Sequence, residues 1–183
     1  MPSGPGVIDD ASICDIAAAI PPPISTFLLT SETTAEGVID HYQRVQTTTI
    51  QLVDALEGRR YEVIRKALPH VKLVQVIHVT GSDSIREAQE IAPLVDAILL
   101  DSGNPNASTK ELGGTGRTHN WDISRQICAS IDKSVFLAGG LNAENVAQAI
   151  EAVRPFGLDL CSGVRTNGKL DEEKLKAFFE AIG

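Results

Sequence analysis

Asp101 is the residue of this sequence whose type and position point most directly to chemistry. It closes the apolar run at residues 95–101 and is followed by Ser102 and Gly103. A carboxylate at the end of an apolar strand is a candidate general acid or base. Asp-Ser-Gly is also good turn chemistry, so a turn or capping role stays open for Asp101 from position alone.

Two glycine-bearing stretches follow later in the chain. Gly139 and Gly140 lie between an apolar run and a helical pattern, and Ser162 and Gly163 lie at the end of the next apolar run. Glycines let the backbone approach an anion, and a helix N-terminus supplies unpaired N–H groups. A lone Gly-Gly pair is usually a turn, whereas two such stretches in consecutive units predict one phosphate-binding site.

Three further residues are weaker candidates for a pocket. His78 ends the apolar run at residues 72–78, where it can reach the pocket or serve the structure alone. Gly114 belongs to a flexible Gly-Gly-Thr-Gly loop, and Arg117 follows that loop, where contact with substrate and a surface role are both open. The three cysteines include no Cys-x-x-Cys pair and so give no metal-binding signature.

The elements that must position these residues alternate along the chain. Short aliphatic and β-branched runs, typical of strands buried on both faces, occupy residues 25–30, 48–53, 72–78, 95–101, 134–138 and 157–161. Helical periodicity occupies residues 9–20, 34–46, 60–68, 83–91, 122–131, 143–153 and 171–182. The order is therefore one helix followed by six strand–helix units.

Strict alternation of strands and helices predicts an α/β fold with a parallel sheet. A doubly wound sheet would carry a glycine-rich turn after an early strand, whereas the glycines here come late, as in a (β/α)₈ TIM barrel. We therefore expect the TIM-barrel family, with six recognisable βα units instead of eight. Neither a linker nor a shift in composition divides the chain, so residues 1–183 are predicted to form a single barrel domain.

Charge and composition exclude several partners. The formal net charge is −8 and aromatic residues make up 4% of the chain, so a nucleic-acid partner is not expected. The longest early apolar run contains three consecutive prolines and has no positive flank, which fits neither a signal peptide nor a membrane span. The cysteine usage and the absence of a leader pattern predict a cytoplasmic protein.

Four stretches in series resemble the phosphoribosylanthranilate isomerase family of tryptophan biosynthesis. They are LLDS at 99–102, GGTGRTHNW at 113–121, LAGGLNAENVAQAI at 137–150 and PFGLDLCSGVRTNGKLDEEKLKAFFEAI at 155–182. The similarity is dense from about residue 98 to the C-terminus and weaker but collinear upstream, where TTIQL at 48–52 is the clearest match.

The resemblance implies a (β/α)₈ barrel that catalyses an Amadori rearrangement of a phosphorylated small molecule without cofactor or metal. An acid protonates the ribose ring oxygen to open the ring, and a base then removes the C2′ proton. By resemblance Asp101 is the general acid. The backbone amides of Gly139, Gly140, Ser162 and Gly163 would bind the substrate phosphate.

The sequence also departs from the family pattern. The family begins with a strand bearing a Lys-Ile-Cys-Gly-like motif whose cysteine is the base, and these 183 residues contain no such motif. We therefore expect a barrel without its first βαβ segment, with Met1 at an internal position of the family pattern, and with impaired activity. A non-catalytic phosphometabolite-binding or assembly protein and a related phosphosugar isomerase are the alternatives.

Six strands cannot close an eight-stranded barrel. The first and last strands would then leave unpaired edges and exposed apolar side chains, which favour association with another chain. We expect a homo-oligomer that covers this seam, or an N-terminal segment rearranged to fill it.

Overall fold

The computed structural model describes residues 7–103 and 119–183. Contacts divide the chain into two compact units. The first comprises Met1–Val76 and Leu94–Asp96, and the second comprises Ile77–Pro93 and Ala97–Gly183. In the part of the chain that is described, every helix is too short or too polar to cross a membrane.

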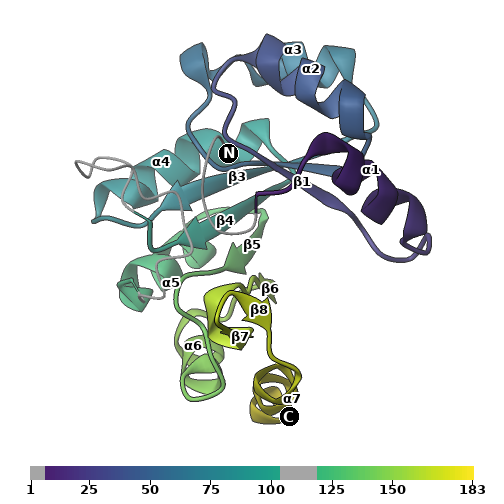
Figure 1. The fold of residues 1–183 in the computed structure, drawn as a ribbon. Helices are drawn as coiled ribbons and strands as arrows, with labels where there is room; N and C mark the ends of the chain where they lie inside the picture. Colours follow the sequence, from purple (N-terminus) through teal and green to yellow (C-terminus); the bar gives the residue numbers. More distant parts are fainter. Residues whose placement is uncertain (1–6, 104–118) are drawn as a thin grey trace. The chain divides into compact units, whose positions relative to one another are not determined.

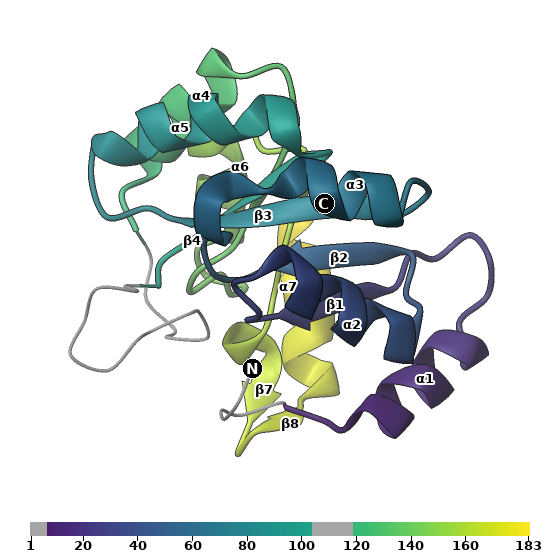
Figure 2. The same ribbon diagram turned by 90° about the horizontal axis from the view of Figure 1, so that it is seen from above.

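The first unit is built on parallel strands. Strand β1 (Phe27–Thr30) pairs in parallel with β2 (Thr49–Leu52), which pairs in parallel with β3 (Lys72–His78). The last two residues of β3 are counted with the second unit. Helix α2 (Ala35–Val45) contacts both α1 (Asp10–Ala19) and α3 (Tyr61–Ala67), and Figure 2 shows the three helices in that order. The short helix η1 (Glu57–Arg59) precedes α3. Buried Val38, Ile50 and Ile64 form part of the core of this unit.

Local signals explain where α2 begins and ends. The side chain of Thr34 accepts a hydrogen bond from the backbone N–H of Gly37 and caps the helix. Gln46 ends it in the left-handed region, with φ 52°. The helix buries Val38 and Val45 on one face, as its apolar spacing predicts.

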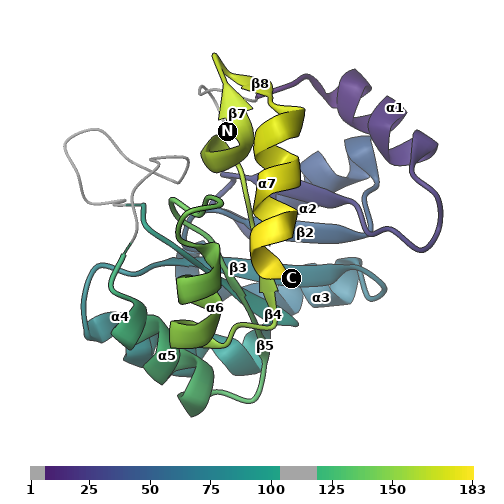
Figure 3. The ribbon, with the colours of Figure 1, turned by 90° about the horizontal axis from the view of Figure 1, so that it is seen from below.

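The second unit repeats the same architecture. Strands β4 (Ala97–Asp101), β5 (Ser134–Leu137) and β6 (Gly157–Leu158) pair in parallel and in that order. The helices are α4 (Asp83–Ile91), α5 (Trp121–Ser130), α6 (Val146–Val153) and α7 (Glu172–Ile182). Two short helices are η2 (Ala92–Leu94), whose last residue is counted with the first unit, and η3 (Ser162–Val164). Figures 1 and 3 show α4, α5 and α6 side by side, and α7 contacts α6.

The predicted elements are confirmed, with small differences at their ends. The strand expected at 157–161 is formed only at Gly157–Leu158, and the helix expected from 143 begins at Val146. An antiparallel hairpin of β7 (Arg165–Thr166) and β8 (Lys169–Leu170) was not predicted. That residues 1–183 form a single domain stays a prediction.

Candidate functional site

In the second unit, the carboxyl ends of three neighbouring strands lie side by side. The backbone N–H of Ala138 donates to the carbonyl oxygen of Leu100 at 2.8 Å, and that of Asp159 donates to Leu137 at 2.9 Å. These bonds continue the parallel pairing past the ends of β5 and β6. Asp101, the loop after β5 and Asp159 are therefore neighbours at the edge of the sheet where α/β folds place their sites.

Asp101 is the last residue of β4, as the sequence predicts. The side chain is buried, with 6% of its surface exposed, and the strand residues before it are buried apolar side chains. Its Oδ1 accepts a hydrogen bond from the backbone N–H of Ser102 at 2.8 Å. This bond stabilises the turn after the strand and holds the carboxylate at the strand end. A role of Asp101 in the turn is therefore compatible with a role as acid or base.

Asp159 places a second carboxylate near Asp101. The residue Asp159 as a whole is exposed to solvent, whereas its carboxylate group is largely surrounded by protein atoms. Desolvation first, and then the negative charge of Asp101, raise the pKa of Asp159 above its ordinary value. The carboxylate of Asp159, which follows β6, therefore binds a proton more tightly than an ordinary aspartate does.

We predict a pH signature for Asp159→Asn. A raised native pKa means that the folded protein binds more protons than the unfolded chain above the unfolded value of about 3.9. Folding stability from this group therefore falls as the pH rises from about 4 through the native pKa. Denaturant unfolding at several pH values should show that the variant lacks this decline.

Asp171 serves as a control because its pKa is shifted in the opposite direction to that of Asp159. Hydrogen bonds from Thr166 and from the backbone N–H of Lys174 lower the pKa of Asp171. Asp171→Asn should therefore lose stability at neutral pH and show little change in acid, below both pKa values. Identical pH profiles for Asp159→Asn and the wild-type chain would contradict the coupling of Asp159 to its surroundings.

The loop after β5 is a tight turn that only glycine fits. Gly139 and Gly140 have φ values of 85° and 66°, in the region that L side chains rarely adopt. A Cβ on Gly139 would lie 2.8 Å from Oγ of Ser102, so this loop packs against the turn that follows Asp101. The glycine pair therefore brings backbone next to the candidate acid.

Asn145 holds this loop in place, a role that no local sequence pattern indicates. Its Nδ2 donates to the carbonyl oxygen of Gly140 at 2.9 Å, and its Oδ1 accepts from the backbone N–H of Asn142 at 2.9 Å. The side chain of Asn142 in turn accepts from the backbone N–H groups of Glu144 and Asn145. Asn142 thus caps the turn ahead of α6, whereas Asn145 orients the glycine loop.

The second glycine stretch lies against the first. A Cβ on Gly163 would overlap the carbonyl oxygen of Leu141, so the two backbones are in direct contact. Ser162 begins η3 and is exposed, while Val164 anchors η3 in the core. The two stretches therefore form one continuous surface of backbone and small side chains, as a phosphate cradle requires.

The histidines differ in their surroundings. His78 ends β3, is half-buried, and its carbonyl oxygen accepts a hydrogen bond from Ser84. His119 Nε2 lies 2.6 Å from Oγ of buried Ser124, and burial lowers the pKa of His119 to about 4. His119 is therefore neutral at pH 7 and packs against the first turns of α5.

The remaining candidates fall elsewhere. Gly114 and Arg117 lie outside the described residues. Within residues 7–103 and 119–183, no group of three histidine, cysteine, aspartate or glutamate side chains is arranged to hold a metal ion.

Comparisons with known proteins agree on one family. Residues 29–181 match the family model described as N-(5′-phosphoribosyl)anthranilate (PRA) isomerase. An N-(5′-phosphoribosyl)anthranilate isomerase from Methanocella arvoryzae is 34% identical over 168 residues, which cover 91% of this chain and 76% of the relative. One from Nostoc punctiforme is 31% identical and covers 100% of this chain and 85% of the relative.

Solved structures agree with this result. The phosphoribosyl anthranilate isomerase from Thermotoga maritima superposes with a TM-score of 0.80 at 27% identity, covering 99% of this chain and 83% of that one. An isomerase in complex with reduced 1-(o-carboxyphenylamino)-1-deoxyribulose 5-phosphate superposes with a TM-score of 0.76 at 26% identity, covering 99% and 82%. The TIM-barrel fold class expected from the sequence is thereby confirmed. With a family match over most of its length and relatives above 30% identity, this chain belongs to the N-(5′-phosphoribosyl)anthranilate isomerase family.

Proposed function

We propose that this chain converts N-(5′-phosphoribosyl)anthranilate to the corresponding amino-ketose, an isomerisation in tryptophan biosynthesis. The observation that carries the proposal is the second unit's strand-end arrangement: buried Asp101 lies beside two glycine stretches in contact with each other. A general acid next to a surface suited to phosphate is what ring opening of a phosphorylated glycosylamine needs. The family membership supplies the substrate class.

In the proposed mechanism Asp101 donates its proton to the ribose ring oxygen. The bond between C1′ and that oxygen breaks with its electrons leaving to oxygen, while the nitrogen lone pair forms a C=N bond. A base then removes the proton on C2′, and those electrons form a C1′=C2′ bond and restore the neutral amine. The enol becomes the ketone by proton transfer, so the reaction conserves atoms and electrons without an oxidant, a reductant or a cofactor.

The proposed phosphate site uses Gly139, Gly140, Ser162 and Gly163. Support comes from the positive φ of the first two glycines, from the tie between Asn145 and Gly140, and from the direct contact of Gly163 with the Leu141 carbonyl. The start of α6 follows the first stretch, and a helix N-terminus favours a phosphate charge. The substrate partner is thus an anionic phosphate ester despite the chain's net negative charge.

The base that removes the C2′ proton is the part of the proposed mechanism for which this chain offers the weakest candidate. The 183 residues contain no Lys-Ile-Cys-Gly-like motif, and His78 at the end of β3 is the group in this chain that we assign as an alternative base. General acid–base groups typically contribute about 10²–10⁴-fold to a rate. We therefore expect the chain alone to turn over slowly.

Calorimetric titration with the reduced product analogue tests the binding part of the proposal. We expect the analogue to bind, and we expect removal of its phosphate to weaken binding by at least about 100-fold, because several hydrogen bonds to a charged group are lost and each contributes about 1.5–3 kcal/mol. Equal affinity for the two compounds would contradict a phosphate site. Tight binding without any turnover would favour a non-catalytic phosphometabolite-binding protein instead.

We also propose that the protein acts in the cytoplasm as a homo-oligomer. Exposed apolar side chains of the second unit, among them Phe156 and Phe179, support association. Light scattering should give a mass above the 19.5 kDa of one chain. A stable monomer with cooperative unfolding, binding no dye specific for exposed apolar surface, would contradict the oligomer.

A further inference from the structure

A cavity of about 480 Å³ opens at the amino ends of β5 and β6, within the second unit. Its lining comes from the last turn of α5, from residues 131–135 around the start of β5, and from residues 154–156 before β6. Asp101 and the two glycine stretches lie at the carboxyl ends of the strands, and none of them lines this cavity. The cavity is therefore a separate place in the same unit.

Two cations line the cavity from equivalent positions. Strands β5 and β6 pair with Phe136 opposite Gly157, and Lys133 and Arg154 each come three residues before that pair. Both side chains line the cavity and are exposed. Among the described residues, neither of them forms an ion pair. The two charges are therefore available to an anion that enters the cavity.

The cavity also holds one carboxylate, that of exposed Asp132. Its lining thus has one positive charge in excess, on a chain whose formal net charge is −8. Such a local excess favours small anions. Because cations placed just after a helix also stabilise its carboxyl end, the charges by themselves do not identify a ligand.

An exposed aromatic ring gives the cavity a second means of recognition. Phe156 lines the cavity and is 72% exposed. Its ring meets that of Phe136 at 86°, with the ring centres 5.5 Å apart, and most of its surface stays uncovered. Ile131, Val135 and Pro155 add apolar lining. A free phenyl ring in this position can stack against a flat aromatic group.

The cavity therefore combines two cations, an aromatic ring and an apolar wall. Guanidinium and ammonium groups bind carboxylates through charge-assisted hydrogen bonds. The volume falls in the usual range of small-molecule sites. We propose that this cavity binds a small aromatic carboxylate, whose charge contacts Lys133 and Arg154 and whose ring stacks on Phe156.

Three probe compounds test this proposal on the wild-type chain by NMR titration. We expect 2-naphthoate to bind and to shift the backbone amide signals of Val135 and Phe156. Its neutral counterpart 2-naphthamide should bind about tenfold more weakly, because it loses two exposed ion pairs. Cyclohexanecarboxylate keeps the charge but has no flat ring, so it should also bind about tenfold more weakly. Added salt should weaken binding of the two carboxylates only.

A second titration separates this cavity from the proposed isomerase site, whose substrate also contains an aromatic carboxylate. With the reduced product analogue present in excess, the affinity for 2-naphthoate should stay the same. The amides of Gly139 and Gly163 should not respond to 2-naphthoate. If the analogue itself fails to bind, the proposed function fails, whereas the shifts at Val135 and Phe156 still test this cavity.

Phe156→Leu tests the stacking. It should weaken binding of 2-naphthoate about threefold to tenfold and leave cyclohexanecarboxylate unaffected, because only the flat ring can stack. Phe179→Leu is the matched control, since Phe179 is a 62% exposed phenylalanine on α7 and does not line the cavity. Circular dichroism of both variants checks their folds.

Arg154→Asn tests the charge. Arg154 has a φ of 55°, which asparagine tolerates, so the variant removes the cation without new backbone strain. It should weaken binding of both carboxylates about fivefold and leave 2-naphthamide unaffected. Lys169→Gln removes an exposed cation of β8, away from the lining, and should change none of the three affinities.

Four results would overturn the proposal. The first is the absence of shifts at Val135 and Phe156, and the second is equal affinity for 2-naphthoate and 2-naphthamide. The third is displacement of 2-naphthoate by the reduced product analogue, which would place it in the isomerase site. The fourth is self-association that Phe156→Glu abolishes and 2-naphthoate cannot displace, which would make a second copy the occupant.

Discussion

Asp101→Asn should lower isomerase turnover by about 10²–10⁴-fold, the usual contribution of a positioned general acid. Asparagine keeps the shape of aspartate and can preserve the acceptor for the Ser102 N–H, but it cannot deliver a proton to the ring oxygen. The loss should therefore appear in kcat. Steady-state kinetics, together with calorimetry of the reduced product analogue, separates this loss from a loss of binding.

The same substitution at Asp132 serves as the control. Asp132 is an exposed residue just before β5, at the amino end of the strand, so Asp132→Asn should leave turnover unchanged. Turnover of Asp101→Asn within twofold of the wild-type rate would remove Asp101 from the proposed mechanism. A parallel loss of analogue affinity and of thermal stability would indicate a structural role only.

Gly163→Val should weaken binding of the phosphorylated analogue by about 10–100-fold, equivalent to one lost hydrogen bond to a charged group. Even the first side-chain carbon would overlap the carbonyl oxygen of Leu141, so the two glycine stretches must separate. Gly140→Val acts at the other stretch, where φ of 66° disfavours any side chain. Calorimetry with the analogue measures both variants.

Gly81→Ala is the matched glycine control. A Cβ at Gly81 would meet nothing within 4 Å, so its replacement should leave both affinity and stability unchanged. Thermal unfolding of the Gly163 and Gly140 variants shows whether the unit still folds. A folded Gly163→Val variant with wild-type affinity would exclude this surface as the phosphate site.

The sequence predicted the order of elements well because each element carries its own local signal. Residues 97–100, directly before Asp101, are all apolar, and burial on both faces of β4 explains that pattern. The β7–β8 hairpin was missed although its turn residues, Asn167 and Gly168, both have positive φ and form a typical hairpin pair. Strands of two residues carry too little periodicity to be recognised without that turn signal.

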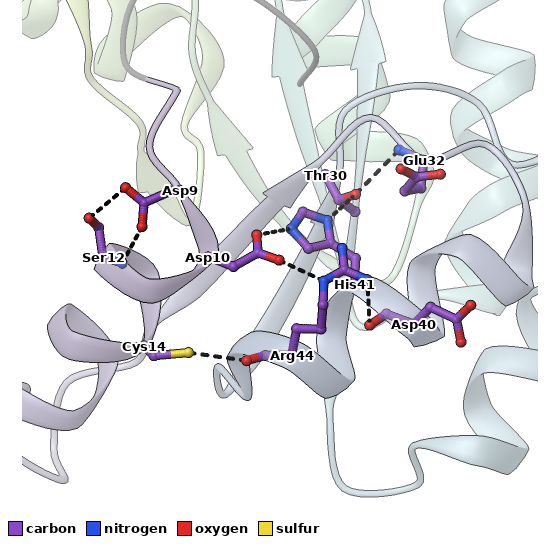
Figure 4. Close-up of polar contacts among 9 residues, drawn as sticks. All are labelled: Asp9, Asp10, Ser12, Cys14, Thr30, Glu32, Asp40, His41 and Arg44. Carbon is purple, nitrogen blue, oxygen red and sulfur yellow. Dashed lines mark hydrogen bonds and ion pairs between the residues drawn. The ribbon is translucent and has the colours of Figure 1, made fainter.

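The candidate site was predicted in part. Asp101 and the glycine stretches could be named because strand ends and glycines before helices have recognisable local patterns. Asn145 could not, because its role depends on a hydrogen bond to Gly140 that only the folded loop creates. The contacts of Asp10 with His41 and Arg44 (Figure 4) could not be predicted either, because residues about 30 positions apart in the sequence meet only in the folded chain.

The most direct test of the proposed function is the turnover of different substrates by the purified chain. The proposed function predicts slow conversion of N-(5′-phosphoribosyl)anthranilate to the amino-ketose, above the uncatalysed rate. Ribose 5-phosphate, which offers the phosphate but lacks the anthranilate nitrogen that drives ring opening, should not be converted. Faster conversion of ribose 5-phosphate, or no conversion of the anthranilate compound above the uncatalysed rate, would contradict the proposed function.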